Sequence, residues 1–142
     1  MSSIAVDIMT PDRLVMHTEA ESVIVPAADG QLGILPHHAP LLAQLVPGEI
    51  HLRRGENVEL FAVSGGFVEV ENNRVSIFAE TAEMSHEIDA ERARQAAERA
   101  KEQVKIARSD VDLAQAEAAL RRALVRLRVT EGLRHGRKPT YR

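Results

Sequence analysis

Two pairs of arginines in the C-terminal part of the chain have a spacing that suits anion binding. Arg92 and Arg99 are seven residues apart, and Arg122 and Arg126 are four apart, so on a helix each pair shares one face. A guanidinium group can hold phosphate oxygens in a bidentate manner. Because Arg122 and Arg126 lie one turn apart, both can face one phosphate group.

The usual catalytic motifs are missing from the sequence. It contains no GxxxxGK[ST] phosphate loop. Ser64 lies in VSGG rather than in GxSxG, which predicts a strand-end turn or bulge and not a nucleophile. No HxH or HExxH spacing occurs among the histidines, so we expect no metal site. The histidines are His17, His37, His38, His51, His86 and His135.

Composition limits the kind of core and of covalent or metal cross-link that the chain can form. At 142 residues the chain can form one ordinary domain or two small ones. Aromatic residues make up only 3% and tryptophan is absent, so the core must be aliphatic. Cysteine is absent, which excludes disulfides and thiolate metal sites. We expect neither a signal peptide nor a segment inserted in the bilayer.

Charge is distributed unevenly along the chain. Residues 1–84 carry a net charge of −8 and residues 85–142 a net charge of +5, which together give the chain's −3. The basic half could meet an acidic partner. The alternative is two solvated surfaces of opposite charge, and charge alone favours it.

The N-terminal part has the period-two pattern of half-buried β-strands. Val6 and Ile8 alternate with polar or small residues, and Ile50 and Leu52 alternate with His51. Hairpin turns are predicted at residues 54–57 and at Asn72–Asn73, the latter of type I′. The prolines and glycines of residues 25–50 predict a connected set of tight turns pinned to the β core. Many short strands favour a small β-sandwich or barrel over residues 1–84.

After Glu83 the apolar period changes to that of helices. Small apolar residues recur every three or four positions, with Asp89 as the expected N-cap; they are Ala90, Ala93, Ala97, Ala100, Val104 and Ala107. Ser109, followed by Asp112, predicts the start of a second helix, which we expect to end at Gly132. One face of this helix carries Leu113, Ala116, Leu120, Ala123 and Leu127. Residues 85–142 are therefore predicted to form an antiparallel two-helix hairpin with a basic tail.

The small side chains of this hairpin suggest that it can move. Burying an alanine methyl group gains little free energy, because apolar burial is worth only about 25 cal/mol per Å². A hairpin held by an alanine seam would be marginal and able to separate. The alternative is that the alanines merely let the helices approach closely.

Four motifs, in order along nearly the whole chain, resemble the ε subunit of rotary ATP synthases. They are GQLGILPHHAPL at residues 30–41, FAVSGGFVEV at 61–70, IDAERA at 88–93 and DVDLAQA at 110–116. The resemblance implies a non-catalytic regulatory subunit of a bacterial F-type enzyme. It also implies a position at the cytoplasmic face of the plasma membrane, peripheral to the bilayer and without nucleic acid as a partner.

The resemblance further implies partners and a ligand. The β-sandwich would dock on the γ subunit and on the ring of c subunits, with Asp29, Gly30, Gln31 and Leu32 as ring contacts. His38 would have a structural or interfacial role. The hairpin would be a switch that restrains ATP hydrolysis when extended towards the catalytic α/β subunits. The basic residues for that contact would be Arg121, Arg122, Arg126 and Arg128.

The IDAERA motif resembles the mark of a site that binds ATP without hydrolysing it. ATP would then be a regulatory ligand, and no catalytic cofactor or catalytic residue is implied. The matching residues are Glu83, Ile88, Asp89, Arg92, Ala93, Arg99, Arg122 and Arg126.

Two other functions stay open at this stage. One is a free-standing β-sandwich enzyme that uses His37 and His38. The other is a nucleotide-sensing adaptor that belongs to no ATPase.

Overall fold

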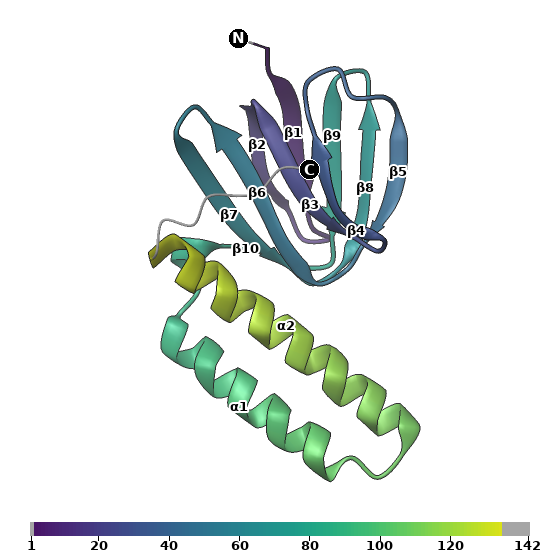
Figure 1. Ribbon diagram of the computed structural model, residues 1–142, viewed down its shortest axis with the longest axis vertical. Helices are drawn as coiled ribbons and strands as arrows, with labels where there is room; N and C mark the ends of the chain where they lie inside the picture. Colours follow the sequence, from purple (N-terminus) through teal and green to yellow (C-terminus); the bar gives the residue numbers. More distant parts are fainter. Residues whose placement is uncertain (1, 135–142) are drawn as a thin grey trace.

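The computed structural model describes residues 2–134 and contains a β-sandwich followed by a helical hairpin (Figure 1). The strands are β1 (Ile4–Met9), β2 (Leu14–Ala20), β3 (Ser22–Ala27), β4 (Gly30–Ile34), β5 (Leu41–Leu45), β6 (Gly48–Arg54), β7 (Asn57–Val63), β8 (Gly66–Glu71), β9 (Arg74–Ala79) and β10 (Ala82–Met84). A short 3-10 turn, η1 (Ser85–Glu87), leads into α1 (Ala90–Ile106) and α2 (Asp110–Arg134). The predicted fold class is confirmed.

The strands form one strongly curved sheet that folds over an aliphatic core. Their order is β10-β7-β6-β3-β5-β8-β9-β1-β2, and β4 pairs with β3 outside this path. All neighbours are antiparallel except β1 and β9, which run parallel. Isoleucine, valine and leucine side chains dominate the core, and Phe61 is the largest fully buried side chain. The alternation predicted for Val6 and Ile8 is confirmed, since both are fully buried.

The predicted hairpin turns are confirmed. Asn72 and Asn73 have φ angles of 51° and 57°, as a type I′ turn requires at both central residues. Arg54 pairs with Asn57 across the other turn, where Gly55 has φ 62°. These two turns fix the registers of β8 with β9 and of β6 with β7.

Residues 25–50 contain more strand than the turn prediction allowed. Two complete strands, β4 and β5, lie within this stretch, together with the end of β3 and the start of β6. Pro26 lies within β3 although it has no amide hydrogen to donate. Its carbonyl oxygen accepts a hydrogen bond of 2.9 Å from the amide of Val46, so the residue still takes part in strand pairing. Strand β5 fits between Pro40 and Pro47, and β4 contains Gly30 and Gly33, so the prediction of turns alone was wrong.

A cluster of charged side chains ties three strands together at the surface. Asp7 on β1 contacts His17 on β2 and Arg74 on β9. The hydrogen bond with His17 is the largest effect on the pKa of Asp7 and lowers it; burial opposes it, and the hydrogen bond and charge of Arg74 lower it further, so the pKa lies below its ordinary value. The stability that this carboxylate contributes is present at neutral pH and is lost as the pH falls through the lowered pKa.

Both helices begin where the sequence predicts. The Asp89 carboxylate accepts a hydrogen bond of 3.1 Å from the amide of Arg92, and Ser109 Oγ accepts one of 3.1 Å from the amide of Asp112. The end predicted at Gly132 is wrong, because α2 continues to Arg134. One glycine costs a helix only about 1 kcal/mol relative to alanine, which does not force a helix to end.

Helix α2 lies between α1 and the sandwich (Figure 1). Its contact with α1 is the predicted seam of small residues, with Ala93, Ala97 and Ala100 buried on α1. A second buried face, Val125 and Val129, packs against Leu60 and Ala62 on the outer face of β7. The spacing of apolar residues predicts a single apolar face on α2, so this docking face was not predicted.

The same docking explains a buried histidine. The strand pattern places His51 on the outer face of β6, where a solvated side chain is expected, but its exposed fraction is only 5%. His51 pairs with Leu60 in the register, on the face against which α2 packs. Its Nε2 lies 3.0 Å from a Glu49 oxygen, so the imidazole keeps a polar partner on this face.

The connection between β7 and β8 depends on a glycine, which gives our first prediction. Gly66 has φ 130°, and a Cβ atom there would lie 1.9 Å from the Phe78 carbonyl oxygen. We expect Gly66→Ala to lower the free energy of unfolding by roughly 3 kcal/mol or more, because backbone strain and the clash add. Urea denaturation of the isolated chain measures this change.

Gly30 provides a matched control for that experiment. It has φ 123°, and a Cβ atom added there would have no neighbour within 4 Å, so Gly30→Ala introduces the strain without the clash. Equal losses of stability in the two variants would contradict the role of the Phe78 contact.

Candidate functional site

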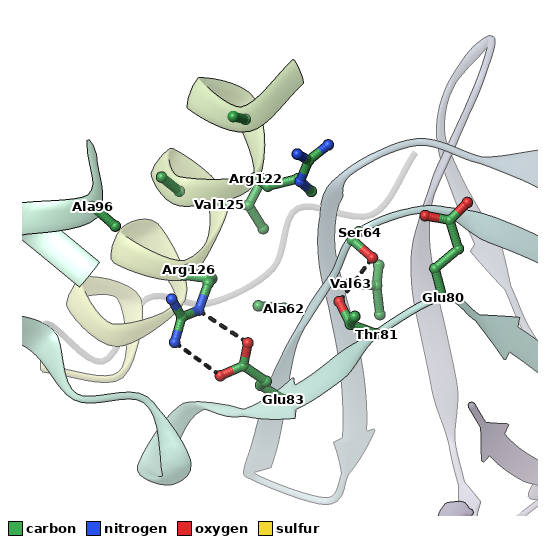
Figure 2. Close-up of a pocket in the computed structure, with 12 residues that line it drawn as sticks. Ala62, Val63, Ser64, Glu80, Thr81, Glu83, Ala96, Arg122, Val125 and Arg126 are labelled. Carbon is green, nitrogen blue, oxygen red and sulfur yellow. Dashed lines mark hydrogen bonds and ion pairs between the residues drawn. The ribbon is translucent and has the colours of Figure 1, made fainter. Parts of the chain in front are cut away.

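A pocket of about 420 Å³ lies where α2 meets the edge of the sandwich (Figure 2). Strand β7, the turn that follows it and the β9–β10 connection form one side of the pocket, and α2 forms the other. Helix α1 contributes only Ala96. The remaining lining residues are Ala62, Val63, Ser64, Glu80, Thr81, Glu83, Ala119, Arg122, Ala123, Val125 and Arg126.

An ion pair links the two sides of this pocket. Arg126 Nη2 donates a hydrogen bond of 3.1 Å to Glu83 Oε2, and Arg126 Nε lies 2.9 Å from Glu83 Oε1. Figure 2 shows the two side chains facing each other across the gap between α2 and β10. Both are 33% exposed, so solvent screens the pair only in part. The two charges neutralise each other, which leaves neither free for a ligand in this state.

Two other charged residues of the pocket have no such partner. Among the residues whose side chains the structure describes, 2–130, neither Arg122 nor Glu80 forms an ion pair. Arg122 extends from α2, and Glu80 lies on the sandwich side of the pocket (Figure 2). A polar ligand in this pocket would therefore meet the Arg122 guanidinium and the Glu80 carboxylate.

Hydroxyl groups complete the sandwich side of the pocket. Thr81 Oγ1 donates a hydrogen bond of 2.7 Å to Ser64 Oγ. Ser64 follows β7 directly and precedes Gly65 and Gly66, both at positive φ, which fits the predicted strand-end turn. Within the described part of the chain no base is hydrogen-bonded to Ser64, so its geometry is not that of an activated nucleophile.

The predicted ATP-binding residues occupy four different places. Glu83, Arg122 and Arg126 meet in the pocket. Ile88 and Ala93 are buried in the contact between the hairpin and the sandwich, and Asp89 caps α1. Arg92 and Arg99 are exposed on α1 and do not line the pocket.

The predicted partner-contact residues lie at the surface. Asp29, Gly30 and Gln31 are exposed at the β3–β4 turn, and Leu32 next to them is half-buried. The arginines predicted to meet the catalytic subunits are exposed on α2, except that Arg126 is half-buried; they are Arg121, Arg122, Arg126 and Arg128.

The two adjacent histidines are held by backbone contacts. His38 Nδ1 lies 2.7 Å from the Ala39 carbonyl oxygen, and the amide of His37 donates a hydrogen bond of 2.8 Å to Asn73 Oδ1. Neither imidazole is hydrogen-bonded to a carboxylate within the described residues, so the pair does not form the acid–base arrangement that the enzyme alternative needs.

Three large apolar side chains form an exposed surface that was not predicted from the sequence. Leu42, Phe67 and Phe78 are 71%, 51% and 46% exposed, and they lie on the neighbouring strands β5, β8 and β9. Phe67 pairs with Phe78 in the register. Strand alternation could have predicted this surface: since Val68 and Val70 point into the core, Phe67 between Gly66 and Val68 must point outward. We call Leu42, Phe67 and Phe78 the apolar face.

Residues 2–134 contain neither a metal-binding cluster nor a membrane-spanning helix. In this range no three His, Asp or Glu side chains are arranged to hold a metal ion. No helix there has both the length and the apolar composition needed to span a lipid bilayer.

Family models cover almost all of the described chain. Residues 3–85 match the model described as ATP synthase, delta/epsilon chain, beta-sandwich domain. Residues 86–131 match the model described as ATP synthase, delta/epsilon chain, long alpha-helix domain.

Individual proteins give the same result. The ATP synthase epsilon chain of Moorella thermoacetica is 52% identical over 97 residues, which are 68% of this chain and 72% of the relative. That of Halalkalibacterium halodurans is 48% identical over 96 residues, with the same two shares. A chain in the structure of the Euglena gracilis mitochondrial ATP synthase has a TM-score of 0.75 at 22% identity, covering 96% of this chain and 82% of that one. This last similarity shows the fold.

The Glu83–Arg126 pair gives our second prediction. In a double-mutant cycle with Glu83→Gln and Arg126→Gln, we expect a coupling free energy of about 1 kcal/mol that falls in high salt. Urea denaturation of the four proteins measures it. The Glu91–Arg94 pair on α1 is the matched control: its side chains are 57% and 63% exposed, and we expect at most about 0.5 kcal/mol there. Equal coupling in both cycles would show that the pair does not fasten α2 to the sandwich.

Proposed function

Because this chain belongs to the delta/epsilon family of ATP synthase chains, we propose that it is the ε subunit in the central stalk of a bacterial ATP synthase. In this role it catalyses no reaction itself. It joins the γ subunit to the ring of c subunits, is held at the cytoplasmic face of the membrane by the complex, and regulates ATP hydrolysis. The observation that carries the regulatory part is that one apolar cluster and one ion pair hold the hairpin to the sandwich.

The apolar face is the proposed docking surface for the γ subunit. Its three side chains are too exposed to stabilise the isolated chain, and exposed aromatic residues on neighbouring strands are typical of protein interfaces. The hairpin does not occupy this surface, because α2 packs on β7 and β6 instead. The exposed β3–β4 turn, residues 29–32, is the proposed contact with the c-ring.

The hairpin is the proposed switch. Its attachment to the sandwich consists of the small cluster around Val125 and Val129 and the Glu83–Arg126 ion pair. The sandwich core does not depend on it, since the main core cluster lies entirely within residues 4–84. Release of this attachment would free the arginines of α2 to meet an acidic surface of the catalytic subunits.

ATP is the proposed ligand that keeps the hairpin docked. A nucleotide in the pocket would contact the sandwich and α2 together, so it would bind only the docked state. It would stabilise that state by RT ln(1 + [ATP]/Kd), about 2.7 kcal/mol when ATP exceeds Kd by 100-fold. That is enough to reverse a switch whose two states differ by about 1–2 kcal/mol, but not one biased by about 5 kcal/mol.

The assignment of the stalk role is tested by reconstitution, our third prediction. The isolated chain should form a complex with purified γ and c subunits, and Phe67→Asp should weaken γ binding by at least about 2 kcal/mol, because it places a charge in an apolar interface. Calorimetry with purified γ measures the change. Leu14→Asp is the matched control, since Leu14 is 56% exposed on β2, outside the apolar face. A chain that captures neither subunit would overturn the proposed role.

The regulatory role is tested in the assembled enzyme, our fourth prediction. Raising ATP should relieve inhibition of hydrolysis by the subunit, and Arg122→Ala with Arg126→Ala should abolish both the inhibition and its dependence on ATP. A pair of probes on the sandwich and on the α1–α2 connection should report compaction when ATP is added. A distance that stays constant at saturating ATP would refute the switch and leave the stalk role standing.

A further inference from the structure

The sandwich side of the pocket carries polar groups that are not among the predicted ATP-binding residues. Ser64, Glu80 and Thr81 lie on two connections, one after β7 and one before β10, and we call them the polar wall. The connections are hydrogen-bonded to each other, from the Ser64 amide to the Thr81 carbonyl oxygen at 3.3 Å and from the Glu80 amide to the Gly65 carbonyl oxygen at 3.0 Å. The polar wall is therefore a fixed part of the sandwich and does not depend on the helices.

The polar wall can mainly accept hydrogen bonds from a ligand. Glu80 is an exposed carboxylate without an ion pair in the described part of the chain, so both oxygens can accept. Thr81 uses its hydroxyl proton on Ser64, which leaves the Ser64 proton as a donor for a ligand. A carboxylate beside hydroxyl groups repels phosphate but accepts hydrogen bonds from the hydroxyls of a sugar.

The opposite side of the pocket has the complementary chemistry. Arg122 on α2 offers a guanidinium that no carboxylate of residues 2–130 neutralises, whereas Arg126 is neutralised by Glu83. Between these two sides the pocket is lined by small apolar residues, among them Ala62, Ala119 and Ala123. The pocket thus presents hydrogen-bond acceptors on the sandwich and an unneutralised guanidinium on α2.

Resting on the proposed binding of ATP, we infer that the polar wall binds the ribose of the nucleotide and makes the site selective for ribonucleotides. Glu80 accepts hydrogen bonds from the 2′- and 3′-hydroxyls, and Ser64 donates to one of them. The phosphates then lie towards Arg122. The nucleotide contacts both elements at once, with its sugar on the sandwich and its anionic part on α2.

Calorimetry on the full-length chain with ATP, 2′-deoxy-ATP and 3′-deoxy-ATP tests this inference. We expect the wild type to bind ATP at least about tenfold more tightly than either deoxynucleotide, the loss expected for one hydrogen bond to a charged group. Glu80→Ala should lower the affinity for ATP most and the affinity for each deoxynucleotide less, because a deoxynucleotide still offers one hydroxyl to Glu80. The three nucleotides should then bind this variant about equally. Ser64→Ala should give a smaller loss in the same direction.

The control is Glu56→Ala, which removes an exposed carboxylate in the β6–β7 turn, away from the pocket. It should preserve the preference for ATP, and Glu80→Gln should retain part of it because the amide oxygen still accepts. Equal binding of all three nucleotides by the wild type, or a preference that survives Glu80→Ala, would overturn the inference while leaving ATP binding intact. A wild-type chain that binds none of them would overturn both the inference and the nucleotide part of the proposed function.

Discussion

The structure depends on the burial of β7 on both of its faces. Phe61 and Val63 point into the sandwich core, while Leu60 and Ala62 point outward and are covered by α2. A strand at this position in a free-standing sandwich would have a polar outer face, so the sequence of β7 already requires a partner. Without α2, these side chains and the buried His51 nearby would lie at an apolar surface exposed to water.

Different faces of α2 make different contacts. Ala116 and Ala123 are buried on α2, Val125 and Val129 meet β7, and Arg126 reaches β10. The valine contact gains free energy by excluding water, whereas the arginine contact is directional and fixes the position of the helix along the strand. Because both contacts lie in the C-terminal half of α2, the rest of the hairpin is held mainly by α1 and α2 themselves.

Much of this architecture could be predicted from local sequence signals. The Asn72–Asn73 turn, the Asp89 cap and the alternation around Val6 each depend on neighbouring residues only, and each is confirmed. The docking face at Val125 was missed because a helix with apolar residues on several sides has no single dominant period. Of the residues that line the pocket, the sequence predicted only Glu83, Arg122 and Arg126 as ligand-binding residues. The polar wall was not predicted, because its two connections are close in space only after β7 pairs with β10. Long-range pairing of that kind leaves no local pattern.

The hairpin is attached to the sandwich at one end only, so a small rotation there moves the other end a long way. Val129 is fixed to β7, while the α1–α2 connection, with Ile106 and Val111 both exposed, lies far from the sandwich (Figure 1). At 1.5 Å per residue, the helix between Val129 and that connection is about 30 Å long. A rotation of only about 10° at the attached end would therefore carry the tip through about 5 Å, roughly one helical turn. Small changes of packing around Val125 are thus amplified into large displacements at the other end of the molecule.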